Sequence, residues 1–188
     1  ADAVGFGYAG VYVALANESG TGFAPTASQW TGAFSYNAGW RVDQHPRMLA
    51  DVNGDGKADA VGFGYAGVYV ALANASGTAF APTASLWTGA FSYNAGWRVD
   101  QHPRLLADVN GDGKADAVGF GYAGVYVALA NDTGTAFAPS ARYWTPAYSY
   151  NAGWRVDQHP RLLADVNGDG KTDAVGFGYA GVFVATSQ

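Results

Sequence analysis

Residues 58–68 read ADAVGFGYAGV, the same sequence begins at Ala1 and Ala115, and the variant TDAVGFGYAGV begins at Thr172. These starting points are 57 residues apart, so the chain is built from a repeated unit. A fixed period of this size is typical of propellers, solenoids and other arrays, in which each unit packs on its neighbours. We divide the chain into repeat units 1–57, 58–114 and 115–171 and a partial unit 172–188.

Each unit contains four short segments with the pattern of β-strands. In the unit that follows Arg47 these segments read MLADVN, ADAVGFG, GVYVALAN and AFAPTASLW. The third segment is apolar at consecutive positions 68–73, as expected for a strand that is covered on both faces. Turn residues at 53–56 and 74–77 separate the strands. We predict an all-β fold, a β-propeller of four-stranded antiparallel blades, because the alternative parallel β-helix normally has shorter repeats.

The composition fits a turn-rich all-β protein. The chain has 27 glycines, 13% charged residues and no cysteine, so disulfides contribute nothing to the fold. The net charge is −5 and the ten Lys and Arg are scattered singly, which argues against nucleic acid as a partner. No stretch approaches the roughly 18 uninterrupted apolar residues of a membrane span, so we expect none.

A loop with the spacing of a calcium site precedes the second strand of the second, third and fourth blades. Residues 108–116 read DVNGDGKAD, with side-chain oxygens at positions 1, 3, 5 and 9, a backbone carbonyl at position 7 and glycine at position 6. A hard cation binds about six to eight oxygens, and alternate side chains of a tight loop converge on one point. The predicted Ca²⁺ ligands are Asp51, Asn53, Asp55, Lys57 and Asp59, then Asp108, Asn110, Asp112, Lys114 and Asp116, then Asp165, Asn167, Asp169, Lys171 and Asp173.

A simple hairpin turn is the alternative explanation of these loops. Against it, carboxylates gathered in one short loop repel one another unless a cation neutralises them. Position 12 of the middle loop is Gly119, so the bidentate Glu of an EF-hand is missing and we expect weak to moderate affinity. Affinities of that order are typical of extracellular modules, and we therefore expect a secreted or extracellular protein.

A long crossover follows the last strand of the first, second and third blades. Residues 88–104 read TGAFSYNAGWRVDQHPR, which is too long for a hairpin turn, so we expect the crossover to line a cleft between blades. Aromatic rings suit the C–H face of a sugar, and planar polar groups suit its hydroxyls. Packing between blades explains each tryptophan equally well. The predicted carbohydrate-binding residues are Tyr36, Asn37, Trp40, Arg41 and His45, then Tyr93, Asn94, Trp97, Arg98 and His102, then Tyr150, Asn151, Trp154, Arg155 and His159.

The run DVNGDGKADAVGFG with GVYVALAN, followed by FSYNAGWRVDQHPRLLADVNGDG, resembles the blades of the Psathyrella velutina lectin-like family of calcium-binding β-propellers. These blades are similar to the FG-GAP (VCBS-type) repeats of integrin α chains. The resemblance covers essentially the whole chain and implies N-acetylglucosamine-like ligands bound between adjacent blades. Lectins of this family close their ring within one chain, whereas this chain holds only about half as many blades.

We therefore predict a multivalent carbohydrate-binding lectin with calcium-stabilised blades. An integrin-like propeller that binds a protein partner is the alternative, because fold alone does not decide function. We do not expect an enzyme: Asp100, His102 and their copies are the main groups left over for catalysis, and no Ser or Cys nucleophile accompanies them.

The pattern of segments also predicts how the chain assembles. It opens at a second strand and closes in a third, which gives fourteen strands divided as three, four, four and three. Open strand edges invite pairing with another chain, and closed propellers usually have about four to eight blades. We expect a homodimer or higher homo-oligomer that closes the ring, with a fragment of a longer chain as the alternative.

Overall fold

The computed structural model describes residues 1–188 and consists of β-strands with no helix, which confirms the all-β prediction. Without a helix, the structure contains no long apolar helical segment that could cross a membrane. The strands are β1 (Ala3–Phe6), β2 (Val11–Ala14), β3 (Ser28–Thr31), β4 (Arg47–Ala50), β5 (Asp59–Phe63), β6 (Val68–Ala71), β7 (Ser85–Thr88), β8 (Arg104–Ala107), β9 (Asp116–Phe120), β10 (Val125–Ala128), β11 (Arg142–Thr145), β12 (Arg161–Ala164), β13 (Asp173–Gly178) and β14 (Gly181–Ala185).

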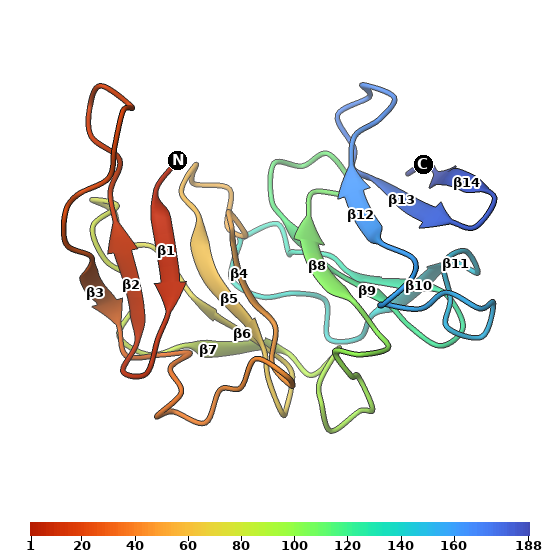
Figure 1. Cartoon of the computed structure of the whole chain (residues 1–188), viewed down its shortest axis with the longest axis horizontal. Coiled ribbons are helices and arrows are strands. Elements are labelled where there is room, and N and C mark those ends of the chain that lie inside the picture. The colour runs from red at the N-terminus through yellow and green to blue at the C-terminus, as the bar shows by residue number, and fades with distance from the viewer.

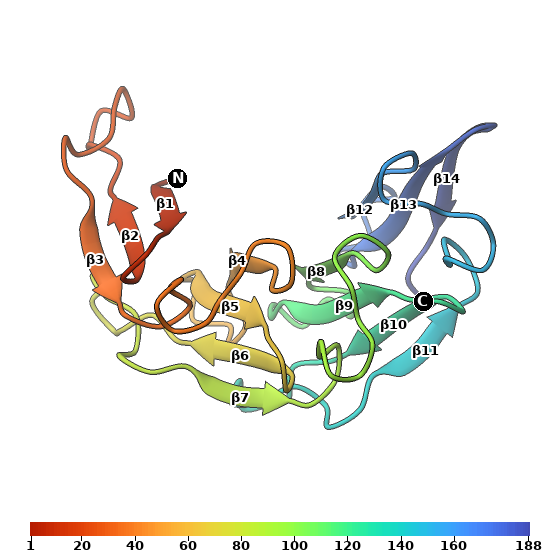
Figure 2. The same ribbon diagram turned by 60° about the horizontal axis from the view of Figure 1, so that its bottom comes forward.

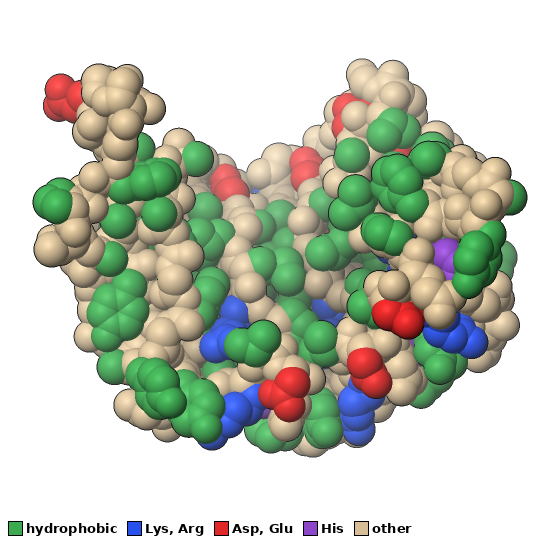
Figure 3. Space-filling model, in the orientation of Figure 1, with side chains coloured by type: hydrophobic (Ala, Val, Ile, Leu, Met, Phe, Trp, Pro, Cys, Tyr) green, Lys and Arg blue, Asp and Glu red, His purple; other side chains and the backbone are tan.

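The strands form four antiparallel sheets in chain order, with three, four, four and three strands as the sequence predicts. We call them the first sheet (β1–β3), the second sheet (β4–β7), the third sheet (β8–β11) and the fourth sheet (β12–β14). Figures 1 and 2 show the sheets following one another along an open arc, with the first and fourth sheets at its two ends. In Figure 3 a hollow separates these ends, and hydrophobic side chains lie on both sides of it.

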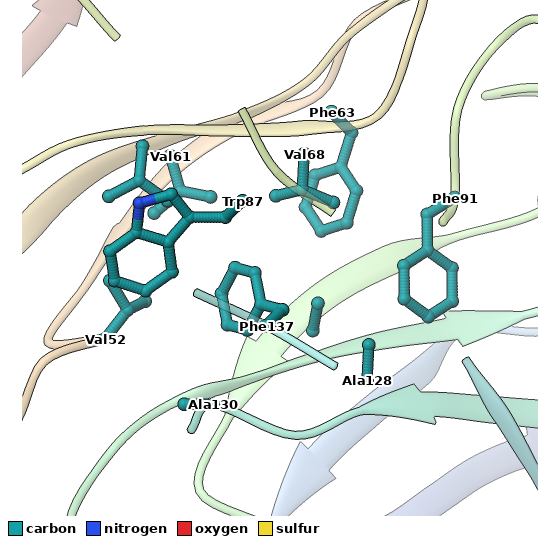
Figure 4. Packing of buried hydrophobic residues seen from close by; sticks show 11 residues of the cluster. Val52, Val61, Phe63, Val68, Trp87, Phe91, Ala128, Ala130 and Phe137 are labelled. Carbon is teal, nitrogen blue, oxygen red and sulfur yellow. The ribbon is translucent and has the colours of Figure 1, made fainter. Parts of the chain in front are cut away.

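The hydrophobic core is divided into three clusters, each between two neighbouring sheets. In the middle cluster, shown in Figure 4, Val61 and Phe63 of the second sheet pack with Ala128 of the third. Trp87 from β7 reaches Phe137 of the next sheet, with 5.1 Å between ring centroids. Valine and phenylalanine on one sheet therefore face alanine on the next, which allows the sheets to approach closely.

Hydrogen bonds also join neighbouring sheets at both ends of the strands. At one end, the Thr88 hydroxyl donates to the carbonyl of Ala138 in the next sheet, at 2.9 Å. At the other end lie the predicted calcium loops, where the Ala115 N–H donates to the carbonyl of Asp51 at 2.8 Å. The crossovers, residues 32–46, 89–103 and 146–160, lie at the end opposite the calcium loops because successive strands are antiparallel.

Candidate functional site

Three pockets of similar composition recur where the crossovers meet the sheets. Each is lined by a tryptophan and a histidine from the crossover before a sheet and by a tyrosine from the turn after that sheet's second strand. The second-sheet pocket has a volume of about 510 Å³ and the third-sheet pocket about 420 Å³. The fourth-sheet pocket measures about 180 Å³, because it lacks the wall that residues 82–84 and 139–141 supply to the other two.

The third-sheet pocket is built around Trp97, which is half-buried. Its indole ring is enclosed edge to face by Phe91 and His102, at centroid distances of 5.0 and 5.4 Å. On its inner side it lies against Gly119 of β9, where an added Cβ would come within 2.5 Å of the ring. The Gly-Phe-Gly sequence of the second strand therefore makes room for the tryptophan, and the remaining face of the indole lines the pocket.

The backbone of the crossover is held in an unusual conformation. Phe91 has a φ of 59°, in the left-handed region that a bulky residue rarely adopts, at a cost on the order of 1–3 kcal/mol. Phe34 and Tyr148 have φ values of 59° and 60° at the equivalent positions. The Phe91 ring is fully packed in the core, and its carbonyl accepts a hydrogen bond from the Arg104 guanidinium at 3.4 Å. Packing therefore stabilises this turn, which sets the position of Trp97.

His102 lines the third-sheet pocket and has a ring N–H group without a hydrogen-bond partner. Its Nδ1 accepts the backbone N–H of Arg98 at 3.2 Å, so the proton of the neutral ring resides on Nε2. Nε2 is buried and has no hydrogen-bond partner in the protein. Burial, and after it the charge of Arg104, lowers the pKa of His102 to about 4. A neutral imidazole donor beside an indole face is suited to a polar, uncharged ligand.

The titration of His102 should make the protein less stable in acid. An unfolded histidine has a pKa near 6.5, so between about pH 6.5 and 4 the unfolded chain binds a proton that the native state does not, and stability falls as the pH falls. We expect the free energy of unfolding of the wild type, relative to that of His102→Asn, to fall by about 3 kcal/mol across this range. Denaturant titrations of both proteins at pH 7, 5.5 and 4 measure this free-energy difference. If the difference between wild type and His102→Asn does not change with pH, the lowered pKa is contradicted.

The other residues predicted to bind sugar lie outside the pocket walls. The Arg98 guanidinium stacks on the Tyr93 ring at 3.7 Å and donates to the carbonyls of Tyr93 and Trp97, at 2.6 and 3.0 Å. The backbone N–H of Asn94 donates to the carbonyl of Tyr65 at 3.0 Å, and the Asn94 side chain is exposed. The same arrangement recurs in the other two copies, at Tyr36, Asn37 and Arg41 and at Tyr150, Asn151 and Arg155. The pocket walls instead receive Trp40, Trp97 and Trp154 with His45, His102 and His159.

Sequence reasoning missed several residues that line the pockets. Tyr122 follows β9 in the turn Gly-Tyr-Ala-Gly, its ring lies 4.2 Å from that of His102, and its hydroxyl donates to the Gln101 side chain at 2.7 Å. Tyr126 of β10 and residues 139–141 complete the wall. The sequence did contain a signal for Tyr122, a tyrosine in a glycine-rich turn. Turns by themselves favour small or polar residues, so a large aromatic residue there indicates another role.

The predicted calcium loops are curled around their first aspartate. Asp108 accepts the backbone N–H groups of Gly111 at 2.7 Å, Asp112 at 3.2 Å and Gly113 at 2.8 Å. The Lys114 ammonium lies 3.1 Å from the Asp112 carboxylate. The loop backbone is therefore already folded around the carboxylate at position 1, while a lysine offsets part of the negative charge.

The aspartate at position 9 makes a different set of contacts. Asp116 is fully buried and accepts the N–H groups of Val109 at 3.1 Å and Ala130 at 2.7 Å, so it joins the loop to the end of β10. Burial raises its pKa to about 6, and that of the equivalent Asp59 also to about 6. No three Asp, Glu or His side chains meet in an arrangement that could hold a metal ion. Calcium binding by the three loops stays a prediction.

Comparisons with known proteins show what the repeat is similar to. Residues 108–176, which are less than half of the chain, match the model of the FG-GAP-like repeat. Its structure is similar to a lectin of Agrocybe aegerita that specifically recognises non-reducing terminal N-acetylglucosamine, with a TM-score of 0.89 and 42% sequence identity. The match covers 100% of this chain and 45% of the lectin chain, so this chain spans less than half of the lectin's length.

A second solved structure, the TcdB2-TccC3-Cdc42 complex, matches with a TM-score of 0.59 over 78% of this chain and 7% of that chain. At 21% identity this match shows a likeness of fold alone. A search of curated proteins found no match. The narrower resemblance to the Psathyrella velutina lectin stays a prediction.

Proposed function

We propose that this chain is a carbohydrate-binding lectin whose crossover pockets bind a terminal N-acetylglucosamine or a closely similar sugar. The observation that carries the proposal is the pairing, in a recurring pocket, of a half-buried indole face with a buried and unpaired imidazole N–H. The likeness to a lectin that recognises this sugar supports it. The relative is a lectin, and we propose no catalytic activity. A catalytic Asp100–His102 pair would use the Nδ1 atom of His102, but this atom already accepts the Arg98 N–H.

Each group in the pocket has a role in holding the sugar. The indole of Trp97 takes the apolar C–H face or the acetamide methyl, because apolar contact with a large ring favours burial of such surface. The Nε2–H of His102 donates to a sugar oxygen and so gains the partner that it lacks in the free protein. A polar ligand pairs with this buried donor, whereas a purely apolar ligand leaves it without a partner, so the pocket favours a polar ligand.

Sugar binding is tested with immobilised N-acetylglucosamine and with calorimetry. We expect retention on the beads, elution by the free sugar and a dissociation constant of roughly micromolar to millimolar per site. Several sites on one rigid scaffold raise avidity, so the protein should agglutinate cells that display the sugar. Immobilised glucose serves as the matched control for the acetamide group. A protein that ignores N-acetylglucosamine beads but captures a protein ligand would support the integrin-like alternative instead.

We also propose that the three loops bind Ca²⁺ and that the ion stiffens the contact between blades. The oxygen spacing and the folded loop backbone support this, as does the bond from the Ala115 N–H to the Asp51 carbonyl, which joins one loop to the next. The ion would draw the side chains of Asp108, Asn110 and Asp112 inward and displace Lys114 from Asp112. A calcium site of this kind also supports secretion.

Calcium should raise the melting temperature with a dissociation constant of about 10⁻⁴ to 10⁻³ M. Calorimetric titration and thermal melts in calcium or chelator measure both quantities. Asp112→Asn should weaken binding because it removes a ligand charge, whereas Asp132→Asn, outside the loops on an exposed hairpin, should not. No heat of binding and an unchanged melting temperature in chelator would sink the calcium proposal.

A further inference from the structure

The crossover between the second and third sheets contacts two pockets, the one that it helps to line and the one before it. Gly64 and Tyr65 belong to the turn after β5 and line the second-sheet pocket. The Gly64 carbonyl accepts the N–H of Tyr93, at 3.0 Å. The Tyr65 carbonyl accepts the N–H of Asn94, also at 3.0 Å. Residues 89–103 therefore hold one wall of the second-sheet pocket while they carry the tryptophan and histidine of the third-sheet pocket.

The ring of Tyr93 packs on the same wall from outside the pocket. It meets Tyr65 edge to face, at 5.4 Å between ring centroids, and lies 6.2 Å from the ring of His45. Tyr65 and His45 both line the second-sheet pocket, whereas Tyr93 does not. A ring packed against two neighbours restricts the positions that those neighbours can take. The place of Tyr93 therefore affects the shape of the second-sheet pocket.

The Arg98 guanidinium joins Tyr93 to the groups of the third-sheet pocket. It stacks on the Tyr93 ring and, through one nitrogen, donates to the carbonyls of Tyr93 and Trp97. The backbone N–H of Arg98 donates to Nδ1 of His102 and so fixes the orientation of that imidazole. Arg98 forms no ion pair with a carboxylate, so charge pairing does not account for a guanidinium here. A planar cation that stacks on a ring and donates to carbonyls does account for it, and lysine lacks that combination.

One repeat later, the same contacts join the third-sheet pocket to the fourth-sheet pocket. The Tyr150 ring lies 5.5 Å from that of Tyr122 and 6.2 Å from that of His102, both of which line the third-sheet pocket. The Arg155 guanidinium stacks on Tyr150 at 3.9 Å and donates to the carbonyls of Tyr150 and Trp154, at 2.6 and 3.0 Å. The third-sheet pocket is therefore held from two sides, by its own crossover and by the crossover that follows it.

We propose that the tyrosine and arginine of each crossover are positioning residues that serve two adjacent sugar pockets without touching the sugar. Tyr93 and Arg98 serve the second-sheet and third-sheet pockets. Tyr150 and Arg155 serve the third-sheet and fourth-sheet pockets. Loss of one guanidinium should therefore weaken two pockets and spare the remaining one. The inference rests on the proposed function, because it assigns these residues to the affinity for sugar.

Fluorine NMR can measure the three pockets separately in the intact chain. Of the six tryptophans, one lies in each crossover pocket, namely Trp40, Trp97 and Trp154. Incorporation of 5-fluorotryptophan therefore places one label in each pocket. The signals that disappear in Trp40→Phe, Trp97→Phe and Trp154→Phe assign the three labels. Titration with N-acetylglucosamine then gives one dissociation constant per pocket.

Arg98→Lys keeps the charge but loses the planar stack on Tyr93. We expect it to raise the dissociation constants of the second-sheet and third-sheet pockets about fivefold, the size of a lost stacking contact, and to leave the fourth-sheet pocket unchanged. Arg155→Lys should weaken the third-sheet and fourth-sheet pockets and leave the second-sheet pocket unchanged. Each variant is the matched control for the other, because the same substitution is made at the same position of the repeat.

An Arg98→Lys variant that weakens only the third-sheet pocket would overturn the shared role, because the effect would then be confined to one crossover. Equal weakening of all three pockets would also overturn it, because a general loss of structure explains that result. Tyr93→Leu is a second variant in case Arg98→Lys does not fold. It removes the ring that packs on Tyr65 and leaves Arg98 in place, so it should weaken the second-sheet pocket more than the third-sheet pocket. An equal effect on both pockets would contradict the role of Tyr93.

The fluorine signals of the free protein separate this inference from the proposed function. In Arg98→Lys without sugar, the signals of Trp40 and Trp97 should move, while that of Trp154 should stay. If the signals move in this way but no pocket binds sugar, the lectin proposal fails and the positioning role stands. If Arg98→Lys binds sugar in all three pockets with the affinity of the wild type, the positioning role fails and the lectin proposal stands.

Discussion

Replacing Trp40, Trp97 and Trp154 together by alanine is expected to abolish the binding of N-acetylglucosamine. Each indole supplies the apolar face of its pocket, and a contact of about 100 Å² is worth about 2.5 kcal/mol. That loss corresponds to nearly two orders of magnitude in affinity per site, and agglutination, which depends on several sites, should disappear. Calorimetry and a haemagglutination assay measure the two effects.

The triple variant needs a control for folding, because each indole also packs against a phenylalanine and a histidine. Loss of a buried tryptophan costs about 3–5 kcal/mol of stability, so the triple alanine variant could unfold. A parallel variant with phenylalanine at the three positions is the folding control, because it retains a ring in contact with Phe91 and its equivalents. Trp87→Ala removes an indole outside the pockets and should lower stability while leaving the affinity per site unchanged. A folded triple variant that still agglutinates cells would remove these tryptophans from the site.

Gly119→Ala is expected to destabilise the protein by about 2–3 kcal/mol and to weaken sugar binding in the third-sheet pocket. The added Cβ would lie 2.5 Å from the indole of Trp97 and 2.7 Å from the ring of Phe91. Both rings are held by the core and by the left-handed turn, so neither moves away at low cost. Thermal melts should show a drop of roughly 5–10 °C, and calorimetry should show weaker sugar binding.

The effect should repeat at Gly62, where the Cβ would lie 2.4 Å from the ring of Trp40. Gly89→Ala is the control, because its nearest neighbour is 3.8 Å away, and it should change stability by no more than about 0.5 kcal/mol. Equal stability of Gly119→Ala and Gly89→Ala would show that the indole does not occupy this space.

Much of the fold was predictable because the period, the alternation of strands and turns and the two ends of the chain all appear in the sequence. The division into three, four, four and three strands follows from where the repeated segments start and stop. Strand ends were less accurate: the segment GVYVALAN was predicted as one strand, but β6 ends at Ala71 and Ala73 forms only an isolated bridge with Phe80. Local propensity does not indicate where a bulge or an outward turn interrupts the pairing.

The site was predictable in part. Trp97 and His102 were identified because aromatic and imidazole groups in a long crossover are typical of a binding loop, and both line the pocket. Tyr93, Asn94 and Arg98 were grouped with them because they are neighbours in sequence, yet Arg98 is bonded to the crossover's own carbonyls. Sequence proximity does not tell which side of a turn a side chain occupies. Tyr122 and Tyr126 come from the next sheet and reach the pocket only after the blades have packed.

The near-identity of the clusters between sheets has a consequence for how the chain folds. Each blade presents valine and phenylalanine on one face and alanine on the other, so during refolding a blade finds almost equal packing against any blade, near or far, of its own or another chain. Repeats that are this similar are prone to misassembly through non-native pairings of blades. Refolding from denaturant should therefore be multiphasic, with slow phases from chains that must separate mismatched blades before the correct order is reached.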